Sequence, residues 1–159
     1  YSLQAIEGVV MVELRLVPFS EAASNPSFDD YVAEYVEECG DENIGQPAVQ
    51  IERYKELDEQ GCLRCIGVFD GEVLAGLSIL LVTKSQHYSF PLVGIDSIYL
   101  RKPWRHGRTG LDLLGAMKAV AKREGAPGLP VMAPVGSKLE RLCRSMGLSQ
   151  THSAFWCPA

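Results

Sequence analysis

A run of six residues combines arginines with glycines in the way that a phosphate-binding turn requires. The run is Arg105-His106-Gly107-Arg108-Thr109-Gly110, and an apolar helical pattern begins at its end. Glycines let a backbone approach an anion closely, and the free N–H groups at a helix N-terminus attract negative charge. We therefore expect an anion site here. An ordinary strand–helix connection with surface arginines is the alternative.

Asp96 is the candidate general base. It lies on an apolar strand pattern and shares parity with Leu92, Ile98 and Leu100. This parity predicts an apolar face, where loss of solvation makes a carboxylate more basic. A carboxylate that caps neighbouring backbone or binds an arginine is the alternative.

Other chemical motifs are absent or incomplete. The chain has neither the G-x-x-x-x-G-K-[ST] phosphate loop nor the G-x-G-x-x-G dinucleotide fingerprint with its distant acid. Cys62 and Cys65 are three apart on a predicted strand, so their side chains point to opposite faces. The three histidines lack ligand spacing. We therefore predict no metal site.

Hydrophobic periodicity indicates which elements hold these residues. Apolar strand patterns predict strands at residues 11–17, 62–69, 72–83, 92–100, 129–133 and 150–156. Helical spacing predicts helices at residues 28–39, 47–60, 110–124 and 137–145. Asp70-Gly71 predicts a hairpin between the second and third strands. This order indicates an α/β fold with a mixed sheet.

The turn and this element order together resemble the GNAT (GCN5-related) N-acetyltransferases over nearly the whole domain, residues 11–156. Arg105 and Gly110 match the [Q/R]-x-x-G-x-[G/A] signature of that family. Arg108 replaces its first glycine, and Gly107 stands one place early, a variant similar to phage and prophage members. The resemblance implies a mostly antiparallel central sheet flanked by helices, with acetyl-CoA as cosubstrate. It implies that the turn binds the pyrophosphate and that the strand end at Leu100 and Arg101 contacts the pantetheine.

The resemblance also implies roles for residues outside the turn. Cys143 takes the position at which many members have a tyrosine that protonates the departing thiolate; a small buried residue is the alternative, with water as the acid. The two helices before the second strand border the acceptor site in the family. Tyr31 and Tyr35 on the first of them are therefore candidate substrate contacts, beside helix packing.

Charge distribution suggests the partners. The net charge of −5 argues against a nucleic-acid binder. The segment from Glu21 to Gln60 carries 12 acidic residues against two basic ones, which solvated helix faces explain most simply; a surface for a cationic acceptor is the alternative. We expect acetyl transfer to a small cationic amine or a protein lysine. A non-catalytic coenzyme A-binding protein or a protein-interaction module is the alternative, and a homodimer is left open.

Length and composition indicate the number of domains and the cellular compartment. The 159 residues suit one domain, 11–159, and residues 1–10 before Met11 suit an upstream extension or a cloning remnant. No apolar run reaches the ~20 residues of a membrane helix. Five cysteines without regular spacing favour a reducing compartment. These features predict a cytoplasmic protein without a membrane partner.

Overall fold

The computed structural model describes residues 11–158, so the proposed extension at 1–10 lies outside the described residues. The strands are β1 (Glu13–Val17), β2 (Leu63–Asp70), β3 (Val73–Lys84) and β4 (Pro91–Leu100). The helices are α1 (Phe19–Ala23), α2 (Phe28–Glu38), α3 (Ile51–Glu59), α4 (Thr109–Arg123) and α5 (Lys138–Ser145), with a 3-10 turn η1 (Lys102–Trp104).

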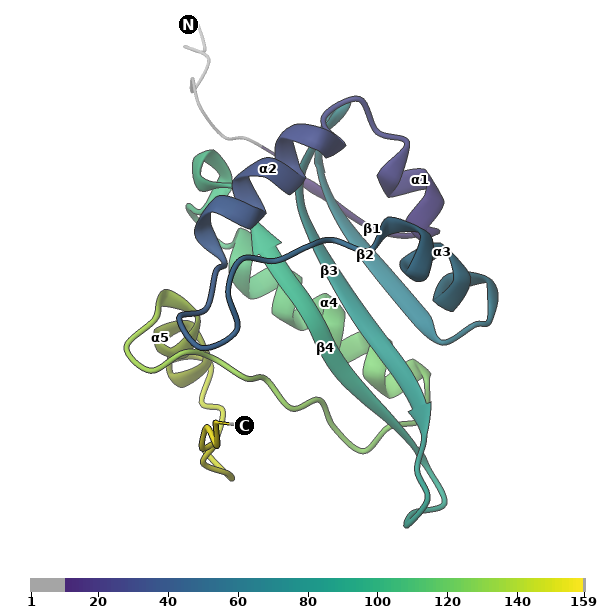
Figure 1. Ribbon diagram of the computed structural model, residues 1–159, viewed down its shortest axis with the longest axis vertical. Helices are drawn as coiled ribbons and strands as arrows, with labels where there is room; N and C mark the ends of the chain where they lie inside the picture. Colours follow the sequence, from purple (N-terminus) through teal and green to yellow (C-terminus); the bar gives the residue numbers. More distant parts are fainter. Residues whose placement is uncertain (1–10, 159) are drawn as a thin grey trace, which may run out of the picture.

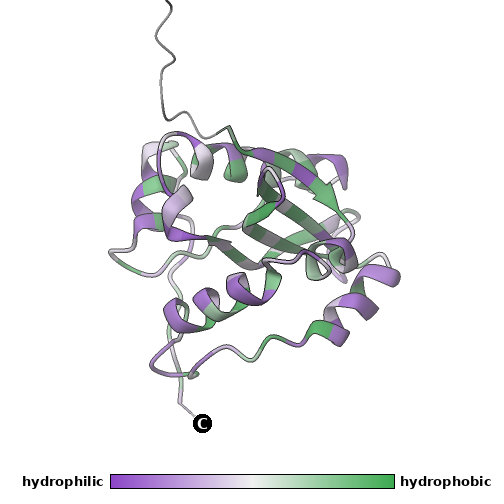
Figure 2. Ribbon diagram, turned by 90° about the horizontal axis from the view of Figure 1, so that it is seen from above, coloured by the Kyte–Doolittle hydropathy of each residue, from purple (hydrophilic) through white to green (hydrophobic). Residues whose placement is uncertain are grey.

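The four strands form one antiparallel sheet in the order β1-β2-β3-β4, between two layers of helices. Figure 1 shows α1, α2 and α3 on one face and α4 on the other. Seen from above, the apolar strands lie between helices whose outer surfaces are polar (Figure 2). The α/β class and the antiparallel sheet flanked by helices are therefore confirmed.

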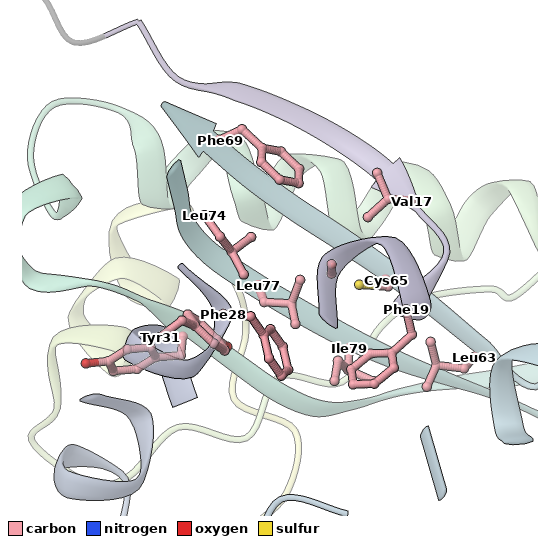
Figure 3. Close-up of a cluster of buried hydrophobic side chains, with 12 residues drawn as sticks. Val17, Phe19, Phe28, Tyr31, Leu63, Cys65, Phe69, Leu74, Leu77 and Ile79 are labelled. Atoms are coloured by element: carbon pink, nitrogen blue, oxygen red, sulfur yellow. The ribbon is translucent and has the colours of Figure 1, made fainter. Parts of the chain in front are cut away.

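Each face of the sheet buries its own apolar cluster. On the first face, Phe19 of α1 and Phe28 and Tyr31 of α2 pack over Leu77 and Ile79 of β3 (Figure 3). On the second face, α4 buries a stripe at helical spacing against β2, β3 and β4: Leu113, Leu114, Met117, Val120 and Ala121. Residues three and four apart share one side of a helix, which is why this sequence covers the sheet.

The sheet departs from the sequence prediction in the C-terminal part of the chain. Residues 129–133 and 150–156, both predicted as strands, have no strand conformation. Leu129 and Val131 still pack against the α4 cluster, so the alternating pattern reflects burial without strand pairing. Within residues 11–158, no strand pairs with the outer edge of β4.

Two smaller differences concern local boundaries. The hairpin forms one residue later than predicted, with Gly71 at a φ of +56° and Glu72 in the turn. The helix α1 was not predicted, because its five residues are too few for a periodic pattern. It depends on distant contacts: the Phe19 N–H donates to Oδ2 of Asp58 at 2.7 Å.

Candidate active site

The predicted phosphate turn joins the end of β4 to the start of α4. The chain leaves β4 at Leu100, passes through η1, and enters α4 at Thr109. Gly107 has a φ of +58°, a conformation that costs an L-residue about 1–2 kcal/mol. The N-cap residue Arg108 makes no side-chain hydrogen bond to the first turn of α4. The N–H groups of that first turn therefore lack the side-chain cap that usually satisfies one of them.

Gly110 allows the last helix to approach this corner. A Cβ at Gly110 would lie 3.2 Å from Cδ2 of Leu142, a side chain of α5. That distance is tighter than ordinary van der Waals contact, so an added Cβ would require the Leu142 side chain to shift by a few tenths of an ångström. The second glycine of the signature therefore leaves room for this side chain of α5 beside the turn.

Two of the predicted cofactor residues use their side chains elsewhere. Arg105 donates from Nη1 and Nη2 to the two carboxylate oxygens of Glu38, at 2.5 and 2.7 Å, and from Nε to the Leu100 carbonyl. Arg101 donates from Nη2 and Nε to Oε1 of Glu34, at 2.6 and 3.0 Å. These hydrogen bonds hold the pKa of Glu38 at about 2 and lower that of Glu34.

The remaining cations of the turn are exposed. The side chains of Lys102 and Arg108 are 73% and 78% accessible, and His106 is exposed as well. Arg108 lies 3.8 Å from the Asp112 carboxylate, a distance at which an exposed pair is weak. These side chains can therefore reorient towards an anion at little cost.

A small hollow of about 20 Å³ lies between the α2–α3 layer and the sheet. Its walls are apolar and aromatic, and they include Phe19, Phe28, Tyr31, Val32, Tyr35, Val49, Tyr54, Leu77, Ile79 and Ser97. Both predicted substrate residues, Tyr31 and Tyr35, line it. Their rings stack at 6.5 Å between centroids.

Asp96 lies beside this hollow, on the extra residue of a β-bulge. Ile79 of β3 pairs with Ser97 and Leu80 pairs with Ile95, so Asp96 has no partner across the ladder. The bulge reverses strand parity: Ile98 packs in the α4 cluster, whereas Asp96 accepts a hydrogen bond from the Tyr54 hydroxyl at 2.6 Å.

Two predictions about Asp96 are therefore wrong. Its parity with Ile98 and Leu100 is broken by the bulge, and its side chain is exposed, so it is not desolvated by an apolar face. The Asp96 carboxylate accepts a hydrogen bond from the Tyr54 hydroxyl. The alternative prediction, a carboxylate that caps backbone or binds an arginine, therefore had the wrong partner. Burial, with the hydrogen bond to Asp96, raises the pKa of Tyr54 well above its usual range. Tyr54 thus stays protonated and keeps donating to Asp96.

Cys143 lies on α5, next to the Leu142 side chain that approaches Gly110. Burial raises the pKa of its thiol, which makes it a weaker acid than an exposed cysteine. Among residues 11–158, no hydrogen bond joins Cys143 to Asp96 or to the turn.

Sequence reasoning missed three participants: Tyr54, Glu34 and Glu38. Tyr54 could not be linked to Asp96 because 42 positions separate them. A signal did exist for the carboxylates, since Glu34 and Glu38 are four apart on a helix and Arg101 and Arg105 are four apart after a strand. Equal spacing of two carboxylates and two guanidinium groups indicates that the two segments can form ion pairs with each other.

Metal and membrane features complete the description. In the part of the chain that the structure describes, no three His, Cys, Asp or Glu side chains gather as metal ligands do. None of the helices in residues 11–158 combines the length and the apolar character that crossing a bilayer demands.

Solved structures show what this arrangement resembles. The chain superposes with a TM-score of 0.71 on ribosomal-protein-alanine N-acetyltransferase from Brucella melitensis biovar Abortus 2308, at 15% identity over 94% of this chain and 99% of that one. Its TM-score is 0.73 with the aminoglycoside acetyltransferase HMB0005 from an uncultured soil metagenomic sample, at 14% identity over 94% and 99%. AAC(6')-Iy, solved with a CoA-containing bisubstrate analogue, gives 0.68 at 10% identity over 94% and 98%.

No family model matches the chain, and no curated protein matches its sequence. At these identities, the superpositions establish the fold. The chain has the fold of the GNAT acetyltransferases, as the resemblance in its turn predicted.

Proposed function

We propose that this chain is an N-acetyltransferase that moves an acetyl group from acetyl-CoA directly to a primary amine. The observation that carries the proposal is the uncapped N-terminus of α4, preceded by Gly107 at positive φ and flanked by exposed Lys102 and Arg108. Backbone N–H groups, a helix dipole and mobile cations together suit a diphosphate.

The open edge of β4 supports a place for the pantetheine arm. Strand edges present a row of unpaired N–H and C=O groups. Amide groups of pantetheine can pair with such a row along β4 towards Leu100, although the Leu100 carbonyl accepts from Arg105 and the Arg101 N–H donates to Ala75.

Asp96 is proposed to accept the proton of the attacking amine. The amine nitrogen forms a bond to the thioester carbonyl carbon, its proton passes to Asp96, and the C–S bond breaks. Because Tyr54 donates to Oδ2, the other oxygen, Oδ1, remains for the amine. General base catalysis of this kind contributes roughly 10²–10⁴-fold. Holding both reactants in one complex supplies further acceleration.

The departing thiolate needs a proton, and Cys143 is the candidate donor that the family position suggests. Its raised pKa limits the driving force of that transfer. Water is the alternative donor. The proposal therefore expects only a small loss of activity in Cys143→Ser.

The acceptor is proposed to be a small cationic amine or a protein lysine. An aromatic hollow with Tyr31 and Tyr35 in its walls and Asp96 at its side would attract a cation. The structural neighbours include aminoglycoside acetyltransferases and a ribosomal-protein-alanine N-acetyltransferase, whose acceptors are amines.

Thiol release from acetyl-CoA against a panel of polyamines, aminoglycosides and lysine peptides tests this function. We expect release with at least one amine, and a loss of release in Asp96→Asn with coenzyme A affinity unchanged. The weak acid at Cys143 favours one rival, a non-catalytic coenzyme A-binding protein. Binding without release, unaltered in Asp96→Asn, would support that rival.

A further inference from the structure

A charged seam joins α2 to the turn before α4. Glu34 and Glu38 stand one helical turn apart on α2, and each carboxylate receives two hydrogen bonds from one arginine, Arg101 or Arg105. The side chains of Arg101 and Arg105 are only 12% and 21% accessible. The Arg105–Glu38 pair has two parallel bonds, which fix geometry as well as charge, whereas both Arg101 donors go to Oε1 of Glu34.

The seam continues into the aromatic hollow. Tyr99 of β4 donates its hydroxyl to Oε2 of Glu38 at 3.0 Å. Its ring packs edge-on against Tyr31 and Tyr35, at 5.6 Å between centroids in both cases. The guanidinium of Arg105 lies 5.1 Å from the Tyr99 ring centroid. One connected set of side chains therefore runs from the turn to the walls of the hollow.

The seam also engages all three nitrogens of the signature arginine. Arg105 donates from Nε to Leu100 and from Nη1 and Nη2 to Glu38, so only the second N–H of each Nη remains for another acceptor. The Arg108 side chain remains exposed, and so does Lys102, whose Nζ lies 3.9 Å from Oε2 of Glu38.

We infer that Arg105 and Glu38, with Arg101 and Glu34 beside them, are positioning residues that hold the turn against α2 in the conformation that binds coenzyme A. The diphosphate is then bound by the backbone amides of the turn and by the charged side chain of Arg108. This inference rests on the proposed function and deepens it. Because α2 also bears Tyr31 and Tyr35, the seam makes cofactor and acceptor binding energetically linked, and such linkage acts equally in both directions.

The direction in which Glu38→Gln changes coenzyme A affinity separates a positioning role of Arg105 from direct contact with the diphosphate. If Arg105 bound the diphosphate directly, Glu38→Gln would remove a competing carboxylate and coenzyme A would bind as tightly or more tightly. If Arg105 is a positioning residue, Glu38→Gln loosens the turn and coenzyme A binds more weakly. We expect a Kd at least roughly fivefold higher, the lower end of ordinary coupling between sites.

A double-mutant cycle makes the test independent of any single variant. Glu38→Gln, Arg105→Gln and the double variant should weaken coenzyme A binding to about the same extent, since each breaks the same pair. Arg105→Lys should weaken it nearly as much, because lysine keeps the charge but loses the two-pronged geometry. Additive losses in the double variant, or full binding in Arg105→Lys, would overturn the inference.

Two controls bracket the result, both measured by titration calorimetry with coenzyme A. Glu37→Gln removes a charge from an exposed neighbour on α2 and should leave the Kd unchanged. Arg108→Gln should raise the Kd and reduce its salt dependence without altering the KM of the acceptor. Glu38→Gln should instead raise the KM of acetyl-CoA and of the most active amine together, with kcat at saturation nearly preserved.

Amide hydrogen exchange of the unliganded protein keeps the inference separate from the proposed function. Glu38→Gln should speed exchange in residues 101–110, and Glu37→Gln should not. If the wild-type chain binds no coenzyme A, the proposed function fails, and this exchange result alone decides whether the seam holds the turn. If the wild-type chain binds coenzyme A and Glu38→Gln binds it equally well, only the seam inference fails.

Discussion

The turn that precedes α4 is bordered by two regions that hold it in different ways. On the side of α4, an apolar stripe packs against the sheet, and its central residue Met117 is fully buried. On the side of α2, partly exposed charge pairs join Glu34 and Glu38 to Arg101 and Arg105. Apolar burial supplies most of the free energy that places a helix, whereas paired charges mainly select one orientation. The α4 side therefore fixes where the turn is, and the α2 side fixes how it points.

The largest expected effect separates chemistry on the α2 face from binding at the turn. Asp96→Asn should lower kcat by roughly 10²–10⁴-fold, because it removes the proposed base while keeping the side-chain shape. Coenzyme A affinity should not change, since the Asp96 carboxylate is hydrogen-bonded to Tyr54 and not to the turn. Steady-state thiol release and calorimetry measure the two quantities. A kcat within a few fold of wild type would show that another group takes the proton.

Removing apolar burial tests the α4 side. Met117→Ala should lower the free energy of unfolding by about 2–5 kcal/mol, the usual range for a large core side chain replaced by alanine. Lys118→Ala, one position along on the exposed face of the same helix, should change it by less than about 0.5 kcal/mol. Urea denaturation checks both. Similar losses in the two variants would contradict the assigned burial.

Backbone strain in the turn can be compared with equal strain elsewhere. Gly107 and Gly61 have φ of +58° and +70°, and an added Cβ at either would meet no atom within 4 Å. Gly107→Ala and Gly61→Ala should therefore each cost about 1–2 kcal/mol of stability. Only Gly107→Ala should also weaken coenzyme A binding, since only that residue lies in the turn. Equal coenzyme A affinities in the two variants would show that the turn does not bind coenzyme A.

The smallest expected effect is a pH dependence of folding stability that comes from the Glu38–Arg105 pair on the α2 side. The pKa of Glu38 is lowered to about 2 from its usual 4.5, so its pairing with Arg105 stabilises the folded state fully above pH 4.5. That contribution declines as the pH falls from 4.5 towards 2. Wild type should thus exceed Glu38→Gln in urea midpoint at pH 6, and the difference should shrink steadily at pH 3.5 and 2.5. A difference that stays constant with pH would mean that Glu38 is not paired.

The same contrast explains which features could be predicted from the sequence. The helix α4 and strands β2 to β4 follow from apolar periodicity, a local property of neighbouring residues. Residues 129–133 misled that reasoning because their alternating burial against α4 imitates a strand. Strand conformation also requires a hydrogen-bonding partner, which the pattern does not encode.

The candidate site divides in a similar way. The turn between β4 and α4 could be proposed as an anion site because its glycines and arginines are contiguous in sequence. The environment of Asp96 was not, because a bulge between Ile95 and Ser97 reverses the parity on which the prediction depended. Tyr54 and Glu38 were missed as partners because their contacts join segments 42 and 67 positions apart.

The most direct test of the central claim is the response of backbone amides at the start of α4 to coenzyme A. Heteronuclear NMR of the labelled chain should show the largest amide shifts at residues 107–111 on addition of coenzyme A. Pantetheine, which lacks the diphosphate, should leave those amides nearly unmoved. Absence of any shift at 107–111 at saturating coenzyme A would contradict the assignment of this turn as the cofactor site.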